Sequence, residues 1–191
     1  MAGKIVLITG GARSGKSSFA EQYAAAAGEK IAYIATAQIY DQEMEQRVAL
    51  HRRRRPASWQ TFEAPYRAEL AMAAAAAADV ILFDCLTLYT SNLMLSPEAP
   101  TEVEARQQYI LDAVERLLQS AVTTQKTVIF VTNEVGMAIV PENALAREYR
   151  DIAGWVNQKA ARYAGEVYLI VCGLPVTIKT GQQRGVTTND G

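Results

Sequence analysis

The stretch Gly10–Ser17, which reads GGARSGKS, restricts the fold of this chain more than any other feature. It matches the pattern G-x-x-x-x-G-K-[S/T] at every fixed position. The apolar run Lys4–Thr9 before it is typical of a buried strand, and Ser17–Ala27 after it is typical of a helix that Gly28 ends. In this order of strand, glycine-rich turn and helix, successive backbone N–H groups point toward the amino end of the helix, where an anion can bind. The pattern therefore predicts a loop that binds phosphate groups.

Two side chains of this loop have roles that follow from their type and position. Lys16 is expected to reach the β and γ phosphates and act in catalysis, and the Ser17 hydroxyl is expected to ligate Mg²⁺. Asp84, which ends the apolar run VILFD, is the acidic partner that such a loop needs for the metal. The alternative is a glycine-rich turn that matches by chance. The predicted nucleotide contacts in the loop are Gly10, Gly11, Ala12, Arg13, Ser14, Gly15, Lys16 and Ser17.

Short apolar runs alternate with periodic segments along the rest of the chain. The runs read as strands at Ile31–Ala35, Val80–Phe83, Thr127–Val131 and Val167–Val171. The periodic or alanine-rich segments read as helices at Asp41–Arg55, Ala71–Ala78, Glu102–Ser120 and Ala144–Tyr163. Strands without alternation that are separated by helices predict an α/β fold. We expect a P-loop NTPase-like (RecA-like) domain at 1–179, with a mostly parallel sheet and helices on both faces, and a flexible polar tail at 180–191.

Polar residues or glycines follow several of the predicted strands. In an open parallel sheet, ligands bind beyond the carboxyl ends of the strands. Thr132, Asn133 and Glu134 follow one strand, and Cys172 and Gly173 follow the last. For Asn133 and Glu134, solvation of an ordinary loop is the alternative. The second predicted strand ends in three further predicted nucleotide contacts, Ile34, Ala35 and Thr36.

Composition narrows the classes of function. A chain of 191 residues with 50% hydrophobic and 20% charged residues is typical of one globular domain. Its net charge of -1 argues against a general nucleic-acid binder, so we expect no nucleic-acid partner. The lack of a secretory leader or a run long enough for a membrane span predicts a cytoplasmic protein without stable membrane insertion. Cys85 and Cys172 fit no metal-ligand spacing, and both are expected to be buried free thiols.

The segment ALHRRRRP places the only histidine, His51, before four arginines. Met44, Val48 and His51 share one face of the predicted helix, which is typical of a packed core histidine, and an arginine run at a helix end usually faces solvent. The arginines also permit a second interpretation, since guanidinium groups bind triphosphate oxygens and favour a neutral imidazole beside them. A neutral imidazole can attack phosphorus and carry a nucleotidyl group. The residue types leave both interpretations open.

Several longer stretches together carry a family resemblance. They are TGGARSGKS, YIATAQ, D-x-EM-x-x-RV-x-x-H, RRPASW, FDCLT, VTNEVGMAIVPE, REYRDIAGWVNQ and GLPVTIK. From about residue 4 to 179 the chain resembles the adenosylcobinamide kinase/adenosylcobinamide-phosphate guanylyltransferase family. The resemblance implies a bifunctional enzyme of late cobalamin biosynthesis. Such an enzyme phosphorylates the aminopropanol hydroxyl of adenosylcobinamide with ATP or GTP. It then transfers GMP from GTP to adenosylcobinamide phosphate, giving adenosylcobinamide-GDP and pyrophosphate.

The resemblance also implies site residues and an assembly. The histidine that becomes guanylylated in the family lies four residues after an arginine, which places it at His51 after Arg47. Family members form compact homo-oligomers, often trimers. Ala138 stands where the family pattern usually has glycine, so the loop there is expected to differ slightly. Further nucleotide contacts implied by the family are Thr36, Arg54, Arg55, Glu63 and Asp84.

Two other functions are compatible with the residues. One is a P-loop kinase for a small metabolite, in which His51 is only structural. The other is an assembly or switch protein that hydrolyses ATP to drive interactions. The switch protein requires a sizeable exposed partner surface, and the sequence contains no charged or apolar patch that demands one.

Overall fold

A single seven-stranded sheet organises the computed structural model, which describes residues 3–38 and 56–181. The strand order is β3-β2-β4-β5-β1-β6-β7, and only the β6–β7 pair is antiparallel. The predicted α/β fold with a mostly parallel sheet is therefore confirmed. The strands are β1 (Ile5–Gly10), β2 (Ile31–Ala35), β3 (Gln60–Glu63), β4 (Val80–Asp84), β5 (Thr127–Val131), β6 (Glu166–Val171) and β7 (Leu174–Lys179).

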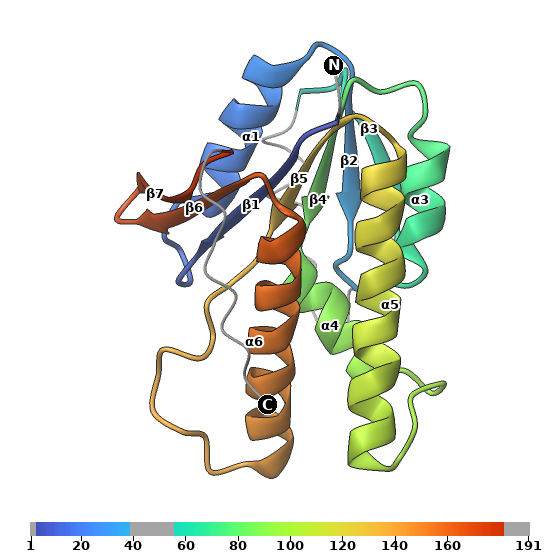
Figure 1. The fold of residues 1–191 in the computed structure, drawn as a ribbon, viewed down its shortest axis with the longest axis vertical. Helices are drawn as coiled ribbons and strands as arrows, with labels where there is room; N and C mark the ends of the chain where they lie inside the picture. The colour runs from blue at the N-terminus through green and yellow to red at the C-terminus, as the bar shows by residue number, and fades with distance from the viewer. Residues whose placement is uncertain (1–2, 39–55, 182–191) are drawn as a thin grey trace.

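Helices cover both faces of the sheet (Figure 1). The helix α1 packs on one face, where Ala20 and Ala24 meet alternate strand residues such as Ile8 and Leu82. The other helices pack on the opposite face against the remaining strand side chains, including Leu7 and Phe83. The described helices are α1 (Lys16–Ala27), α3 (Ala68–Ala74), α4 (Leu86–Met94), α5 (Val103–Thr123) and α6 (Ala144–Tyr163).

The long helices form where the apolar spacing predicts them. Ile110, Val114 and Leu117 of α5 are buried, and the Glu102 side chain caps the helix by accepting hydrogen bonds from the amides of its first turn. Val103 has the helical spacing that predicts the same buried stripe, but it is 44% exposed, so the stripe begins later in the helix. The alanine-rich helix, predicted at Ala71–Ala78, lies earlier in the chain. The helix α3 spans Ala68–Ala74, and the following alanines form a turn before β4.

Three elements were not predicted. The strand β3 has four mostly exposed residues, too few to show a period. The helix α4 begins two residues after β4 and mixes polar with apolar residues, although seven of its nine residues are buried, so no apolar stripe marks it. The strand β7 has no buried apolar run that would predict it, because five of its six residues are exposed. The helix predicted at 41–55 and most of the predicted tail lie outside the described residues.

Two smaller predictions have a clear outcome. Both cysteines are free, but only Cys85 is buried. The prediction that Cys172 is buried is wrong, because this residue lies in the tight turn between β6 and β7 with φ 53°. Ala138 is absent from the residues with positive φ, so alanine fits there without backbone strain.

In the described parts of the chain, no helix is both long and apolar enough to cross a membrane.

Candidate nucleotide site at the carboxyl edge of the sheet

The phosphate-binding pattern forms a tight loop between β1 and α1. Gly10 and Gly15 have φ of 152° and 101°, values that side-chain-bearing residues rarely adopt. Arg13 also has a positive φ, 56°. The Ser14 amide donates to the Gly11 carbonyl at 3.3 Å, and the helix begins directly afterwards at Lys16. The loop therefore lies at the amino end of α1, where backbone N–H groups attract anions.

Lys16 lies folded over this loop. Its Nζ donates to the Gly11 carbonyl at 2.7 Å, and the residue is only 8% exposed. Burial lowers the pKa of the Lys16 ammonium, while the nearby Cys85 and Asp84 act in the opposite direction. The Lys16 ammonium is thus held near the Asp84 carboxylate and beside the backbone of the phosphate loop. A phosphate entering there would meet a desolvated positive charge.

The turn between β6 and β7 closes one side of the loop. The Gly173 amide donates to the Ser14 carbonyl at 2.8 Å, and a Cβ on Gly15 would lie 3.1 Å from the Gly173 Cα. The Ser14 hydroxyl is buried and has no hydrogen-bond partner among the described residues. A buried hydroxyl without a partner is costly unless a ligand supplies one. This orphaned donor fits a loop that takes up phosphate oxygens.

Asp84 lies at the end of β4, fixed by two neighbours. Its Oδ2 accepts a hydrogen bond of 2.5 Å from the Tyr33 hydroxyl, and its carbonyl accepts one of 3.1 Å from the Thr36 amide. Thr36 is fully buried, and its hydroxyl accepts from the Cys85 amide at 2.9 Å. Hydroxyl and carboxylate oxygens are the ligands that Mg²⁺ prefers, so Asp84 and Ser17 fit this ion.

The predicted contacts at the end of β2 lie in one row across the sheet. Ala35 is in register with Glu63 on one side and with Asp84 on the other. Ile34 is fully buried in the core, so its side chain faces the core and not the edge. Thr36 is likewise buried, and its side chain holds the β4 terminus in place. The structure thus brings Asp84 close to the phosphate loop and leaves Glu63 on the edge strand β3.

The segment that follows β5 is more closely joined to the phosphate loop than its residue types predict. Glu134 accepts hydrogen bonds at its Oε1 from the Thr9 hydroxyl at 2.8 Å and from Asn157 Nδ2 at 3.2 Å. Its amide donates to the Gly10 carbonyl at 3.1 Å, so Glu134 is bonded both to β1 and to the first residue of the phosphate loop. The sequence signal was a run of three polar residues directly after a strand, which also fits a solvated loop.

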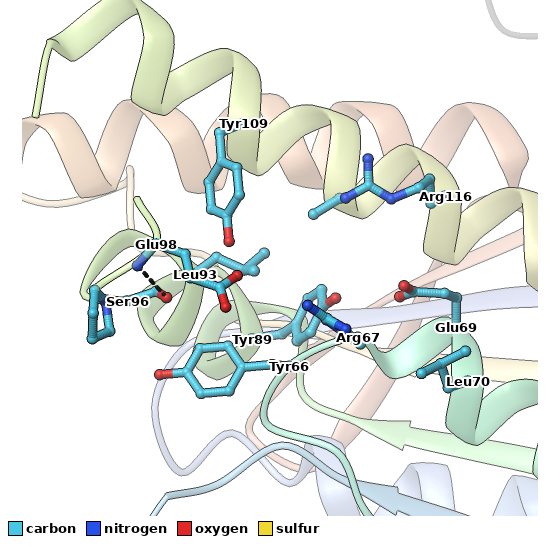
Figure 2. Close-up of a pocket in the computed structure, with 12 residues that line it drawn as sticks. Tyr66, Arg67, Glu69, Leu70, Tyr89, Leu93, Ser96, Glu98, Tyr109 and Arg116 are labelled. Carbon is cyan, nitrogen blue, oxygen red and sulfur yellow. Dashed lines mark hydrogen bonds between the residues drawn. The ribbon is translucent and has the colours of Figure 1, made fainter. Parts of the chain in front are cut away.

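A pocket of about 690 Å³ lies between α3, α4 and α5 (Figure 2). Tyr66, Tyr89 and Tyr109 face it, and Arg67 and Arg116 line it from opposite sides. Burial raises the pKa of Tyr89 to about 12. None of the described residues that were predicted to contact the nucleotide lines this pocket. It therefore lies apart from the phosphate loop.

Three predicted site residues, His51, Arg54 and Arg55, lie outside the described residues. The others define a class of protein: a P-loop nucleotide-binding protein with an α/β sheet, a buried lysine and an aspartate at the neighbouring strand end. The chain belongs to the family described as cobinamide kinase / cobinamide phosphate guanyltransferase, whose model matches residues 6–178.

Similar proteins agree with this membership. The chain is 44% identical over 181 residues to the bifunctional adenosylcobalamin biosynthesis protein CobU of Salmonella typhimurium, covering 92% of this chain and 99% of the relative. It is 43% identical over 178 residues to the bifunctional adenosylcobalamin biosynthesis protein CobP of Pseudomonas aeruginosa, covering 91% and 96%. The flagellar accessory protein FlaH from Methanocaldococcus jannaschii shares the fold with a TM-score of 0.52 at 14% identity, covering 98% of this chain and 83% of that one.

Proposed function

We propose that this protein is a bifunctional enzyme that first phosphorylates adenosylcobinamide and then converts the product to adenosylcobinamide-GDP. The observation that carries the proposal is the phosphate loop, with Lys16 folded over it, in a chain that matches the kinase and guanyltransferase family over residues 6–178. Membership of that family favours the bifunctional enzyme over a kinase without nucleotidyl transfer and over an assembly or switch protein.

In the kinase step, the loop binds the β and γ phosphates of ATP or GTP. Its amides and the unpartnered Ser14 hydroxyl donate to phosphate oxygens, and Lys16 neutralises charge on them. The aminopropanol hydroxyl of adenosylcobinamide attacks the γ phosphorus, and the nucleoside diphosphate leaves. Because Lys16 is almost fully buried, its charge is weakly screened by solvent and acts strongly on the transferring phosphoryl group.

The donor set beside the phosphate loop suits magnesium as the metal for the nucleotide of the kinase step. Ser17 and Asp84 would hold the ion, and the Tyr33 hydroxyl would orient the Asp84 carboxylate. When bound, Mg²⁺ would neutralise negative charge on the phosphate groups.

In the second step, His51 attacks the α phosphorus of GTP and pyrophosphate leaves. The oxygen of adenosylcobinamide phosphate then attacks the guanylylated histidine, which yields adenosylcobinamide-GDP and free imidazole. Arg54 and Arg55 bind the triphosphate. The support for these three roles is the family motif, since all three residues lie outside the described part of the chain.

Strand order supports a separate place for the second nucleotide. Three strands, β2, β4 and β5, stand between β3 and β1. Strand spacings of about 4.8 Å therefore place Glu63, at the end of β3, about 19 Å from the strand that leads into the phosphate loop. We assign Glu63 to GTP in the guanylyl transfer and Lys16 to the kinase step.

Labelling with GTP carrying a radioactive α phosphate tests the second activity. The wild type should retain labelled GMP in a bond that acid breaks and base does not, as expected of a phosphoramidate. The variant His51→Ala should stay unlabelled and still phosphorylate adenosylcobinamide from ATP. Equal labelling of the variant, or an unlabelled wild type, would overturn the assignment of His51.

Turnover with unlabelled substrates separates the remaining functions. Wild type supplied with ATP, GTP and adenosylcobinamide should form adenosylcobinamide-GDP. Product that stops at adenosylcobinamide phosphate would identify a kinase without nucleotidyl transfer. ATP hydrolysis without any corrinoid product would identify the assembly or switch protein.

Assembly and location complete the proposal. We propose a homo-oligomer, a trimer as the family resemblance implies, in the cytoplasm. Exposed apolar side chains on one loop and one edge strand support an assembly: Met137, Ile139, Val140, Leu174, Val176 and Ile178. Light scattering coupled to size-exclusion chromatography tests it, and a monomer at micromolar concentration would contradict it. The boundaries 1–179 for the catalytic domain and 180–191 for the tail are part of the same proposal.

A further inference from the structure

We propose that Glu134 is a catalytic residue of the kinase step. Its carboxylate binds the acceptor hydroxyl of the corrinoid substrate and takes the proton of that hydroxyl during phosphoryl transfer. The inference rests on the proposed kinase activity and goes beyond it by assigning the acceptor side of the reaction.

The position of Glu134 follows from strand register. The strand β5 lies between β1 and β4, and Val131 near its end pairs with Ile8 on one side and with Asp84 on the other. Glu134 comes three residues later, beyond the carboxyl ends of both neighbours. It therefore lies between the strand that leads into the phosphate loop and the strand that ends in Asp84. This part of the edge is therefore open to an acceptor that attacks a phosphate bound by Lys16.

Hydrogen bonds fix the orientation of the carboxylate. The Thr9 hydroxyl and Asn157 Nδ2 both donate to Oε1. Asn157 is itself oriented, because its Oδ1 accepts from the Thr132 hydroxyl at 2.6 Å and its Nδ2 also donates to the Asn133 carbonyl at 3.1 Å. No described residue donates to Oε2 of Glu134. One oxygen is thus anchored, and the other is left for a donor that arrives with the substrate.

The other carboxylates at this edge have different positions. Asp84 already accepts from Tyr33 and shares the metal with Ser17 in the proposed function. Glu63 ends the edge strand β3, on the far side of β2, β4 and β5 from the loop. The Glu134 carboxylate accepts a hydrogen bond from Thr9, and the Glu134 amide donates to the carbonyl of Gly10, so this residue is fixed at the end of β1.

The step balances without another reactant. The hydroxyl oxygen forms the new bond to the γ phosphorus, and the bond from that phosphorus to the β,γ-bridging oxygen breaks. The nucleoside diphosphate leaves with the electron pair, and the hydroxyl proton moves to Glu134 Oε2. A positioned base of this kind contributes roughly 100-fold or more to the rate.

The test compares isosteric variants in the kinase half-reaction, with ATP and adenosylcobinamide and without GTP. Glu134→Gln keeps the shape and the contacts at Oε1 but removes the base, so kcat should fall roughly 100-fold. KM for ATP and the dependence on Mg²⁺ should be unchanged. Glu142→Gln, in an exposed part of the same loop, is the matched control and should keep the wild-type kcat.

Two further measurements separate catalysis from structure. Self-guanylylation with α-labelled GTP should be equal in Glu134→Gln and wild type, which shows an intact fold. Thr9→Val removes one donor to Oε1 and should lower kcat by a smaller factor, with an unchanged KM, as a positioning residue requires.

Several results would overturn the inference. One is a kcat of Glu134→Gln within a few-fold of wild type. Another is recovery of the kcat of Glu134→Gln at high Mg²⁺, because that result would make Glu134 a metal ligand. A wild type that phosphorylates no corrinoid would instead refute the proposed function on which the inference rests.

Discussion

Tyr33 and Asp84 lie on neighbouring strands, β2 and β4, and the tyrosine hydroxyl donates to the aspartate Oδ2 at 2.5 Å. The pair forms at the strand ends, next to the row in which Ala35 is in register with Asp84. A carboxylate held in this way keeps one orientation before any metal arrives. The contact thus links a core side chain of β2 to the acidic partner of the phosphate loop.

Removal of the Tyr33 hydroxyl should loosen this arrangement without unfolding the sheet. Tyr33→Phe is expected to raise the Mg²⁺ concentration for half-maximal kinase activity by roughly 10-fold or more, since a hydrogen bond to a charged group is worth about 1.5–3 kcal/mol. Asp84→Asn should lower kcat by roughly 100-fold or more, as expected when a carboxylate that neutralises the metal is lost. Asp112→Asn, on the exposed face of α5, serves as the control. An unchanged Mg²⁺ dependence in both variants would remove Asp84 from the metal site.

Lys16→Ala should abolish most of the kinase activity. The buried ammonium is the fixed positive charge over the loop, and loss of such a group typically lowers kcat by roughly 100- to 1,000-fold. Steady-state phosphorylation of adenosylcobinamide measures the effect, and the exposed Lys30→Ala provides the comparison. Wild-type turnover in Lys16→Ala would refute the phosphate-loop assignment.

Gly173→Ala should weaken ATP binding although the residue is distant in sequence from the loop. Its φ of 80° costs alanine about 1–2 kcal/mol, and a Cβ there meets nothing within 4 Å, so strain and not a clash is the cause. If the turn relaxes, the Gly173 amide leaves the Ser14 carbonyl, and Kd should rise by up to about 10-fold. Equilibrium titration with ATP measures this. Gly154→Ala, within α6 and also free of close neighbours, should leave Kd unchanged.

Glu115 should contribute to stability in a pH-dependent way. Hydrogen bonds from Lys159, at 2.7 Å, and from Tyr163 lower its pKa below the ordinary value of 4.5. A lowered folded-state pKa means that the stabilisation is present above pH 4.5 and is lost as the pH falls through the folded value. The difference in free energy of unfolding between wild type and Glu115→Gln should therefore shrink in acid. Denaturant titrations at several pH values measure it, and a constant difference would contradict the prediction. Glu29→Gln, at an exposed site, is the control.

The sequence predicted the elements whose signals are local. The phosphate loop is recognisable from its glycines and its lysine, and the bounds of β2, β5 and α6 agree with their apolar patterns. Asp84 could be predicted because a phosphate loop requires an acidic partner at a neighbouring strand end. These features depend on spacing and residue type within a short window.

The rest depends on contacts between distant segments. Tyr66, Tyr89 and Tyr109 are far apart in sequence and share a pocket only because α3, α4 and α5 pack together (Figure 2). The support that Asn157 gives to Glu134 requires α6 to cross the end of β5. Neither the register of β5 between β1 and β4 nor the burial of Thr36 has a signature in a single window of sequence.

The hydrogen bond from Gly173 to Ser14 also affects how the protein matures in the cell. The phosphate loop at residues 10–17 is translated long before the turn at Cys172 and Gly173 that closes it. A nascent chain that still lacks β6 and β7 exposes the loop without its closing turn. Competence to hold ATP should therefore appear late in synthesis, so that incomplete chains do not sequester nucleotide.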